Sequence, residues 1–348
     1  MSALKFALRL LLGSALLIYL FHEHEVELGG VAERLRALPL WAVLAAVAVD
    51  VLSQTLAALR WQRVLRLGGH AQPFRAVWPL HFSGMFFSLC LPTNVGGDVY
   101  KMLGMSRRIG SKSASFASLF LHRDLGMAAL LSLGFVAALA WPTSIEITLR
   151  GTRIATPLWP VFLALGAGFA AVNVILFSRR VYRALDRLLF ARLPEAFRAK
   201  VAKLHASVQA YRVPLPRFAG IYGLALAYQI AEGGCVWLLA RRLGMELPYW
   251  VFAALVTFQA VAGLVPVTIN NIGVREGVFC AVLLGQAAAA GWSDVAIKDG
   301  ALALSLGYFG VVMTSGLIGG AVYMASGLSR QPALDPGVSN TQATAVGP

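Results

Sequence analysis

Long apolar runs separated by clusters of arginine and lysine constrain this chain more than any other feature of its sequence. An α-helix that crosses a bilayer needs about 20 consecutive apolar residues. Runs of this kind lie at 4–21, 39–58, 117–141, 157–178, 217–240 and 300–326. Only 13% of the 348 residues are charged, about half the share in a soluble domain, whose surface must be solvated. We therefore predict an all-α polytopic membrane protein with six full transmembrane helices.

Basic residues indicate which helix ends face the cytoplasm, because cytoplasmic loops carry an excess of arginine and lysine. With the N-terminus inside and one crossing per run, 21 of the 30 basic residues fall on inner segments and seven on outer ones. This asymmetry predicts that both termini are cytoplasmic. The net charge of +14 lies in short clusters between apolar runs, so we expect no nucleic-acid partner.

We assign residues 1–326 to a single transmembrane domain. Within it, segment 179–216 is strongly basic and has apolar residues at helical spacing. This pattern is typical of a helix on the membrane surface whose arginines reach anionic headgroups. Residues 327–348 contain serine, proline and glycine without periodicity, and we predict that they form a disordered cytoplasmic tail.

Two further apolar stretches, 77–92 and 249–290, are interrupted by proline and glycine. Their halves are short for full crossings, and a full crossing at 77–92 would invert every later loop against the distribution of basic residues. We predict two re-entrant hairpins that enter from opposite faces, a pattern that points to inverted repeats around a midplane site. The alternative is that both stretches are ordinary loops between full-length helices.

The first broken stretch ends in a turn whose residues suit a phosphate group. Gly96 and Gly97 let backbone amides approach a ligand closely, and the helix that follows points its positive end to the same place. Lys101 follows one turn later and can supply a cation, Asp98 can cap the helix, and Asn94 lies in the turn itself. The alternative is that these glycines only break a helix.

The second broken stretch carries a comparable set of polar residues. Asn270 and Asn271 offer amide donors and acceptors, and Arg275 can bind a phosphate through two parallel hydrogen bonds. Glu276 can hold that arginine or bind an ammonium group. We predict that the two turns together bind a lipid headgroup, and that Arg275→Ala abolishes transport while membrane insertion stays intact.

Four further ionisable residues fall within the apolar runs: Asp50, Arg123, Asp124 and Glu232. A charge at mid-membrane costs roughly 2.5–3.5 kcal/mol on insertion scales and usually faces a bundle interior or a cavity. Asp50 and Glu232 lie near the centres of their runs and are candidates for a polar cavity or a proton-coupled step. Arg123 and Asp124 lie closer to the inner interface and can form a pair. The alternative for all four is internal ion pairing that fixes helix register.

We identify no motif that indicates an enzyme, a metal or a cofactor. His122-Arg123-Asp124 has the residue order of a kinase catalytic loop, but it stands in an apolar run without the other kinase motifs. The six histidines form no HExxH pattern, and there is no Walker loop or serine elbow. We therefore expect no cofactor and no metal, and favour a transporter over an enzyme.

Two motifs resemble the signatures of one family, the lysylphosphatidylglycerol synthase transmembrane, or flippase-like, domain family. They are 91–101 (Leu-Pro-Thr-Asn-Val-Gly-Gly-Asp-Val-Tyr-Lys) and 265–277 (Val-Pro-Val-Thr-Ile-Asn-Asn-Ile-Gly-Val-Arg-Glu-Gly). The pair Arg60-Trp61 is similar to the one that ends this family's second helix, and the resemblance covers approximately 5–325. It implies a bacterial inner-membrane protein that moves, or helps to move, a polar lipid across the bilayer.

The sequence departs from the family pattern at two positions. His122 stands where an acidic residue usually precedes the arginine, and Asn271 stands where a glycine usually follows Asn270. The first departure leaves Asp124 as the candidate acidic partner of Arg123.

The resemblance favours a flippase for a phospholipid or glycolipid, with anionic or phosphate-bearing membrane lipids as its partners. Multidomain members of the family carry a cytosolic aminoacyl-transfer domain, which we do not find in this sequence, so we expect no synthesis of lysyl-phosphatidylglycerol by this chain alone. Two alternatives stay open. One is a membrane-embedded transferase that uses Asp98 or Glu276 as a base, and the other is a non-catalytic partner of a separate lipid synthase. The sequence does not specify the lipid, the direction of transport or the oligomeric state.

Overall fold

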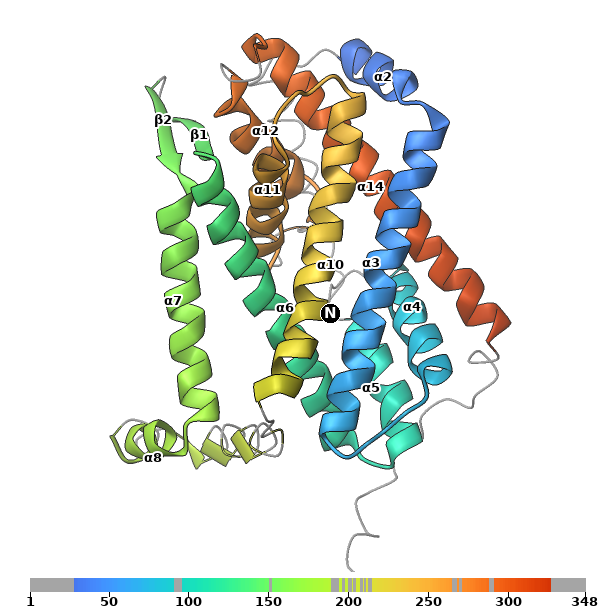
Figure 1. Cartoon of the computed structure of the whole chain (residues 1–348), viewed down its shortest axis with the longest axis vertical. Coiled ribbons are helices and arrows are strands. Elements are labelled where there is room, and N and C mark those ends of the chain that lie inside the picture. The colour runs from blue at the N-terminus through green and yellow to red at the C-terminus, as the bar shows by residue number, and fades with distance from the viewer. Residues whose placement is uncertain are drawn as a thin grey trace, which may run out of the picture.

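The computed structural model shows a bundle of long helices with shorter helices between them (Figure 1). It describes residues 28–90, 96–149, 152–188, 215–264, 268, 271–287 and 291–326, with isolated positions between 194 and 211. The helices of the first half are α2 (Leu28–Ala37), α3 (Leu40–Leu67), α4 (Phe74–Cys90), α5 (Gly96–Ile109) and α6 (Lys112–Ala140). Strands β1 (Ser144–Leu149) and β2 (Thr152–Pro157) follow, and then α7 (Leu158–Phe177), α8 (Arg179–Leu188), α10 (Leu215–Arg242), α11 (Tyr249–Ala262), α12 (Val274–Leu284) and α14 (Asp294–Ala325).

Five of the described helices, α3, α6, α7, α10 and α14, are long and apolar enough to cross a membrane. They coincide with the predicted runs 39–58, 117–141, 157–178, 217–240 and 300–326, which are thereby confirmed as helices. The 20 residues of α7 extend about 30 Å, which matches the hydrocarbon core of a bilayer. The chain is therefore a multi-pass membrane protein. The predicted run 4–21 and the predicted tail 327–348 lie outside the described residues.

Successive spans alternate in direction. In Figure 1, α3, α7 and α14 run downward, whereas α6 and α10 run upward. The pair α4–α5 lies in the lower half, between the end of α3 and the start of α6, and the pair α11–α12 lies in the upper half, between α10 and α14. Helix α8, which opens the predicted surface segment 179–216, lies across the lower end of the bundle. Each short pair thus starts and finishes at one end of the molecule.

Two segments that the prediction treated as outer loops contain regular structure. Segment 22–38 includes α2, and segment 142–156 includes the β1–β2 hairpin, in which Ile147 pairs with Ile154. Isoleucine and threonine recur along both strands, and β-branched residues favour extended backbone. The chain is therefore mostly helical rather than entirely so.

The packing of the first half is repeated in the second. Helix α3 packs against α4, α5 against α6, and α4 against α5; in the same order α10 packs against α11, α12 against α14, and α11 against α12. The halves also exchange contacts reciprocally, because α4 packs on α14 while α11 packs on α6. The equivalent helices α3 and α10 lie against each other in opposite directions.

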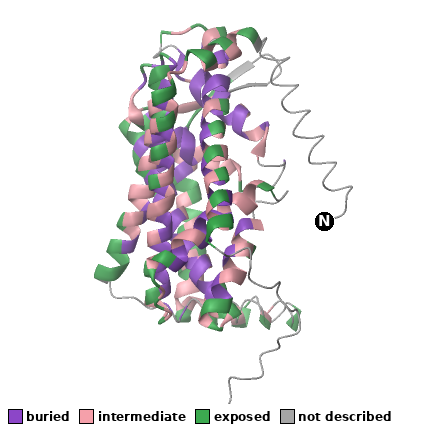
Figure 2. Ribbon diagram, turned by 90° about the vertical axis from the view of Figure 1, so that its right-hand side faces the viewer, coloured by how far each residue is buried: buried purple, intermediate pink, exposed green. Residues whose placement is uncertain are grey.

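Glycines let the short helix α4 approach its neighbours closely. A Cβ atom on Gly97 of α5 would overlap the carbonyl oxygen of Gly84 on α4, and one on Gly319 of α14 would overlap the carbonyl oxygen of Phe82. Helix α4 is therefore held backbone to backbone on two sides. Buried residues gather on the helix faces that meet, and exposed residues lie on the outer faces (Figure 2).

Candidate functional site

A cavity of about 760 Å³ lies among the spans and the short helices. It is within the range of about 300–1,000 Å³ that is typical of small-molecule sites. Its polar lining is Gln54, Arg60, His81, Lys101, His122, Arg123, Asp124, Tyr228, Gln229, Glu232, Gln259 and Tyr308. The rest of the lining is mostly apolar and comes from α6, α7 and α11. The cavity therefore has a charged part and an apolar wall.

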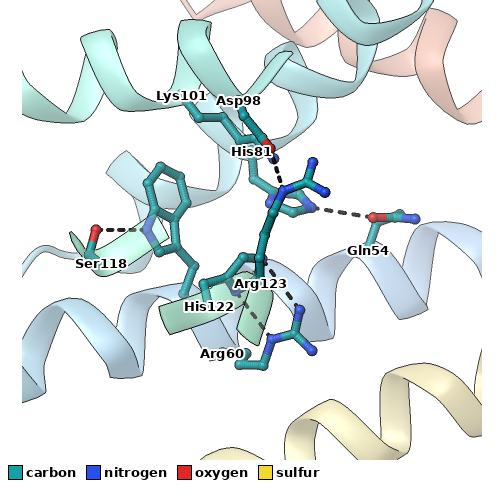
Figure 3. Close-up of polar contacts among 9 residues, drawn as sticks. Gln54, Arg60, His81, Asp98, Lys101, Ser118, His122 and Arg123 are labelled. Atoms are coloured by element: carbon teal, nitrogen blue, oxygen red, sulfur yellow. Dashed lines mark hydrogen bonds and ion pairs between the residues drawn. The ribbon is translucent and has the colours of Figure 1, made fainter. Parts of the chain in front are cut away.

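Three cations and one carboxylate gather at the charged part, and we call Arg60, Lys101, Arg123 and Asp98 the cationic cluster. Lys101 Nζ lies 2.8 Å from Asp98 Oδ1, because their i,i+3 spacing places both on one face of α5. Arg123 reaches across from α6, and its Nε pairs with the other oxygen of Asp98 (Figure 3). Two cations thus share a single carboxylate, and these three groups together carry a net positive charge.

Arg60 is the cation of the cluster that no carboxylate compensates. Only 5% of its surface is exposed, its Nε donates to His122 Nδ1 at 3.2 Å, and its guanidinium carbon lies 5.7 Å from the ring centroid of Tyr228. Its Nη1 has no hydrogen-bond partner, and Arg60 enters no ion pair within the described part of the chain. Arginine stays charged in proteins, and a buried charge is costly without a partner. Arg60 therefore has free capacity for an anion.

The neighbouring helices shape the space around Arg60. A Cβ atom on Gly126 of α6 would stand 3.0 Å from Arg60 Nη2, so the glycine leaves room for the guanidinium. His81 Nε2 lies 3.3 Å from Gln54 Oε1, and Trp61 Nε1 donates to Ser118 Oγ at 3.2 Å (Figure 3). These contacts fix α4 and α6 around α3, on which Arg60 lies.

The second motif has a different electrostatic arrangement. Arg275 Nε donates to Glu276 Oε1 at 3.1 Å and to Ser305 Oγ at 3.0 Å, and its Nη2 also bonds to Glu276. The guanidinium carbon of Arg275 lies over the ring of Phe309, 4.2 Å from the ring centroid. The other oxygen of Glu276 accepts the Gly273 N–H at 2.7 Å and so satisfies the first turn of α12. Arg275 and Glu276 are both buried, and each charge compensates the other.

A smaller cavity of about 300 Å³ lies beside this second motif. Asn271 and Arg275 line it together with residues of α4 and α14. Gln54, Gln259 and Tyr308 line both this cavity and the larger one. The two predicted motifs therefore face two cavities that adjoin at these three side chains.

Asp50 and Glu232 meet where α3 packs against α10. They are 1% and 5% exposed, and their carboxyl groups contact each other. Ser53 Oγ donates to Glu232 Oε1 at 2.6 Å, and the Tyr308 hydroxyl donates to Glu232 Oε2 at 2.7 Å. The structure thus brings together two residues that lie 182 positions apart, from 50 to 232, in the sequence.

The remaining predicted residues lie in three settings. Asn94 and Asn270 lie outside the described residues. Gly97 faces the backbone of α4, so its missing side chain serves the helix crossing, while Gly96 begins α5. Asp124 contacts Asn173 on α7, and the acidic partner of Arg123 is Asp98. The expected Arg123–Asp124 pair is therefore replaced by a pair between α6 and α5.

Sequence reasoning gave several residues of the site no role in it. Arg60 was named only as part of the Arg60-Trp61 pair at a helix end, whereas α3 continues to Leu67 and carries Arg60 into the cavity. The signal that could have identified it is the apolar stretch around it, which is uncommon for a loop arginine. Ser53, His81 and Tyr308 lie within apolar runs or stretches, and no charge distinguishes them there.

The family described as the lysylphosphatidylglycerol synthase TM region matches residues 6–297 of the chain. This range contains the cationic cluster, the carboxyl groups of Asp50 and Glu232, and the second motif. No curated protein matches the chain.

Proposed function

Because the chain belongs to the lysylphosphatidylglycerol synthase transmembrane family, we propose that it moves the polar headgroup of a phosphate-bearing lipid across the membrane. The headgroup passes through the two adjoining cavities, and the acyl chains stay in the bilayer. Its phosphate binds at the cationic cluster, where Arg60, Lys101 and Arg123 are the ligands. Asn271 and Arg275 line the second cavity, and Glu276 holds Arg275 there.

The uncompensated charge of Arg60 is the observation that carries this proposal. A guanidinium matches a phosphate in geometry and forms two parallel hydrogen bonds with it. Arg60 is buried, its Nη1 has no partner, and it lines the large cavity together with Lys101 and Arg123. Among the described residues, Asp98 is the only carboxylate that forms an ion pair with any of the three cations, so together they favour an anionic ligand.

The apolar wall of the same cavity favours a lipid over a soluble phosphate. This wall includes Leu130 and Leu131 of α6 and Leu165 and Phe169 of α7. Burial of acyl chain against such side chains is favourable at about 25 cal/mol per Å², whereas a free sugar phosphate would gain nothing there. A cavity with one cationic and one apolar side suits the junction between a headgroup and its chains.

We further propose that α4–α5 and α11–α12 are re-entrant hairpins of two inverted repeats. Helices of 17, 14, 14 and 11 residues extend about 16–26 Å, less than the hydrocarbon core of about 30 Å. The reciprocal packing of the two halves and the placement of the pairs at opposite ends support this arrangement. Transport then follows from one half rocking against the other around a fixed site.

The proposed location is the bacterial inner membrane, with the lower end of Figure 1 in the cytoplasm. That end carries α8, whose sequence is rich in arginine, and the basic junction between α5 and α6. Cytoplasmic loops are enriched in such residues. The sixth span at 4–21 would place the N-terminus on the same side.

The test is lipid movement in vesicles that contain the full chain. Phosphatidylcholine vesicles carry a trace of fluorescent phosphatidylglycerol, and dithionite bleaches only the probe in the outer leaflet. The inner-leaflet probe should reach the outer leaflet faster in vesicles with wild-type protein than in vesicles without protein. Arg60→Gln should slow this at least about tenfold, because a hydrogen bond to a charged group contributes about 1.5–3 kcal/mol. Arg63→Gln, an exposed position on the same helix, is the matched control and should behave as wild type.

Two results would contradict the proposal. If the wild type moves neither this probe nor a fluorescent polyprenyl-phosphate sugar, the chain is not a lipid transporter. That result would favour the alternative that it is a non-catalytic partner of a lipid synthase. If Arg60→Gln moves the probe at the wild-type rate, the phosphate binds elsewhere than at the cationic cluster.

A further inference from the structure

The contact between Asp50 and Glu232 joins the two halves of the protein. Asp50 lies on α3 and Glu232 on α10, the helices that occupy equivalent places in the two halves and pack against each other. Both carboxyl groups are almost completely buried. An electrostatic feature at this contact therefore acts on the interface between the halves.

The two carboxyl groups have too few donors for two negative charges. Ser53 and Tyr308 each donate to Glu232, while Ser315 and Gln54 contact Asp50. Asp50 Oδ2 is buried and has no donor, and neither carboxylate enters an ion pair among the residues that the structure describes. Two carboxylates in contact cannot both be ionised, because like charges at this distance repel strongly. The pair must hold a proton between its members.

The other groups that face the pair leave this conclusion unchanged. Tyr228 and Cys235 come from α10 and Tyr308 comes from α14, and phenol and thiol groups are mainly neutral at physiological pH. Helix α4 contributes His81, which reaches the pair only through Gln54. Arg60 of α3, Lys101 of α5, and Arg123 and Asp124 of α6 line the same cavity as Glu232. Lys101 and Arg123 are held by Asp98, and none of the three cations forms an ion pair with the two carboxyl groups. Helix α11 has no charged residue.

The pair lies where a proton can reach it from either cavity. Glu232 lines the large cavity, and Tyr308, which donates to Glu232, lines both cavities. Gln54, which contacts Asp50, also lines both. The carboxyl pair thus stands at the junction between the cavity of the cationic cluster and the cavity of the second motif.

We propose that Asp50 and Glu232 form a proton-binding site that couples proton movement to lipid translocation. With one shared proton, the carboxyl groups hold α3 and α10 together; when the proton leaves, two like charges drive the helices apart and favour the other arrangement of the halves. This inference rests on the proposed transport function for its coupling, but the binding of the proton itself does not.

A proton fits this site better than a metal cation does. Hard metal cations need several oxygen ligands arranged around a central space, whereas here the carboxyl groups already contact each other. The hydroxyl groups of Ser53 and Tyr308 donate their hydrogen bonds to Glu232. Their oxygens are therefore not arranged with the carboxylate oxygens around a common metal position. No group of three or more acidic, histidine or cysteine side chains suited to a metal occurs in the described part of the chain.

Infrared difference spectroscopy on the purified full chain tests the site without any lipid substrate. Wild-type protein at neutral pH should show a protonated-carboxyl C=O band that shifts in D₂O. The isosteric double variant Asp50→Asn/Glu232→Gln should lose this band. Glu246→Gln, at an exposed position, should keep it. A wild type without the band, or a double variant that keeps it, would overturn the inference, as would a band that disappears when sodium replaces choline at constant pH.

The coupling is tested in the fluorescent phosphatidylglycerol vesicles under an imposed pH gradient. Wild type and Glu246→Gln should change their rate of probe movement several-fold with the gradient, and the double variant should be indifferent to it. If the wild type moves the probe equally fast with and without a gradient, coupling is refuted and transport stands. If the band behaves as expected but no lipid moves, the proposed function fails and the proton site alone remains.

Discussion

The two motifs of this protein have similar sequences of glycine, acidic and basic residues, yet their charges are arranged in opposite ways. In the first motif, Asp98 is shared by Lys101 and Arg123, and the neighbouring Arg60 forms no ion pair with a carboxylate of the described residues. In the second, Arg275 is matched one to one by Glu276 and is further held by Ser305. An unmatched cation can bind an anion, whereas a matched one is already satisfied. We therefore assign the phosphate to the first motif and a mainly structural role to the pair in the second.

Residue type alone would favour the second motif as the phosphate site. Arg275 stands beside asparagines and a glycine-rich turn, as a phosphate ligand would, and Asn271 and Gly273 adopt the positive φ angles of 57° and 84° that such a turn requires. However, the guanidinium of Arg275 points at Glu276 and Ser305. A site has to be judged by the partners that its charges already have.

The largest effect is expected when the matched pair of the second motif is broken. Glu276→Gln leaves Arg275 buried beside an uncharged partner. Removal of one member of a buried ion pair lowers the free energy of unfolding by about 3–5 kcal/mol. The thermal unfolding midpoint of the purified variant should fall accordingly. The double variant Arg275→Met/Glu276→Gln removes both charges and should recover much of this loss. If Glu276→Gln unfolds at the wild-type temperature, the Arg275–Glu276 pair does not stabilise the fold. The proposed difference in role between the two motifs would then be wrong.

The next largest effect concerns lipid retention at the first motif. Arg60→Gln should reduce the phospholipid that copurifies with the protein in mild detergent by about tenfold or more, because it removes a charged hydrogen-bond donor worth about 1.5–3 kcal/mol. Its thermal stability should change little or rise, since an unpaired buried charge is removed. Quantitative lipid mass spectrometry measures the retention. A greater loss in a folded Arg275→Gln variant than in Arg60→Gln would reverse our assignment of the two motifs.

A smaller effect should follow from crowding Arg60. Gly126→Ala places a methyl group 3.0 Å from Arg60 Nη2 and 3.2 Å from Nη1, so the guanidinium must shift by a few tenths of an ångström. A strained side-chain rotamer costs about 0.5–1.5 kcal/mol, which corresponds to roughly a two- to tenfold loss of lipid retention. Gly223→Ala is the matched control, because a Cβ atom there meets nothing within 4 Å. Equal retention in the two variants would show that the exact position of Arg60 is unimportant.

The spans could be predicted from the sequence because each depends on local information. Apolar runs of membrane length predicted α3, α6, α7, α10 and α14, and all five are helices. The β1–β2 hairpin was missed, because its short strands lie next to apolar runs that dominate the pattern. Its threonine and isoleucine residues were the available signal.

The site could be predicted only in part, because its electrostatics depend on contacts between distant segments. The sequence indicated Asp98, Lys101 and Arg123 separately, but their shared ion pairs require α5 to pack against α6. Likewise, Arg275 and Glu276 are neighbours in any structure, yet only the position of Ser305 on α14 shows that the arginine is satisfied. Charges are visible in a sequence, whereas their compensation is visible only in the fold.

The most direct test of the central claim is an experimental structure of the full chain in lipid nanodiscs that contain phosphatidylglycerol. Our account predicts phosphate density in the large cavity within hydrogen-bonding distance of Arg60 and Arg123, with acyl density along the wall formed by α6 and α7. Phosphate density against Arg275 instead, with the large cavity free of lipid, would contradict it.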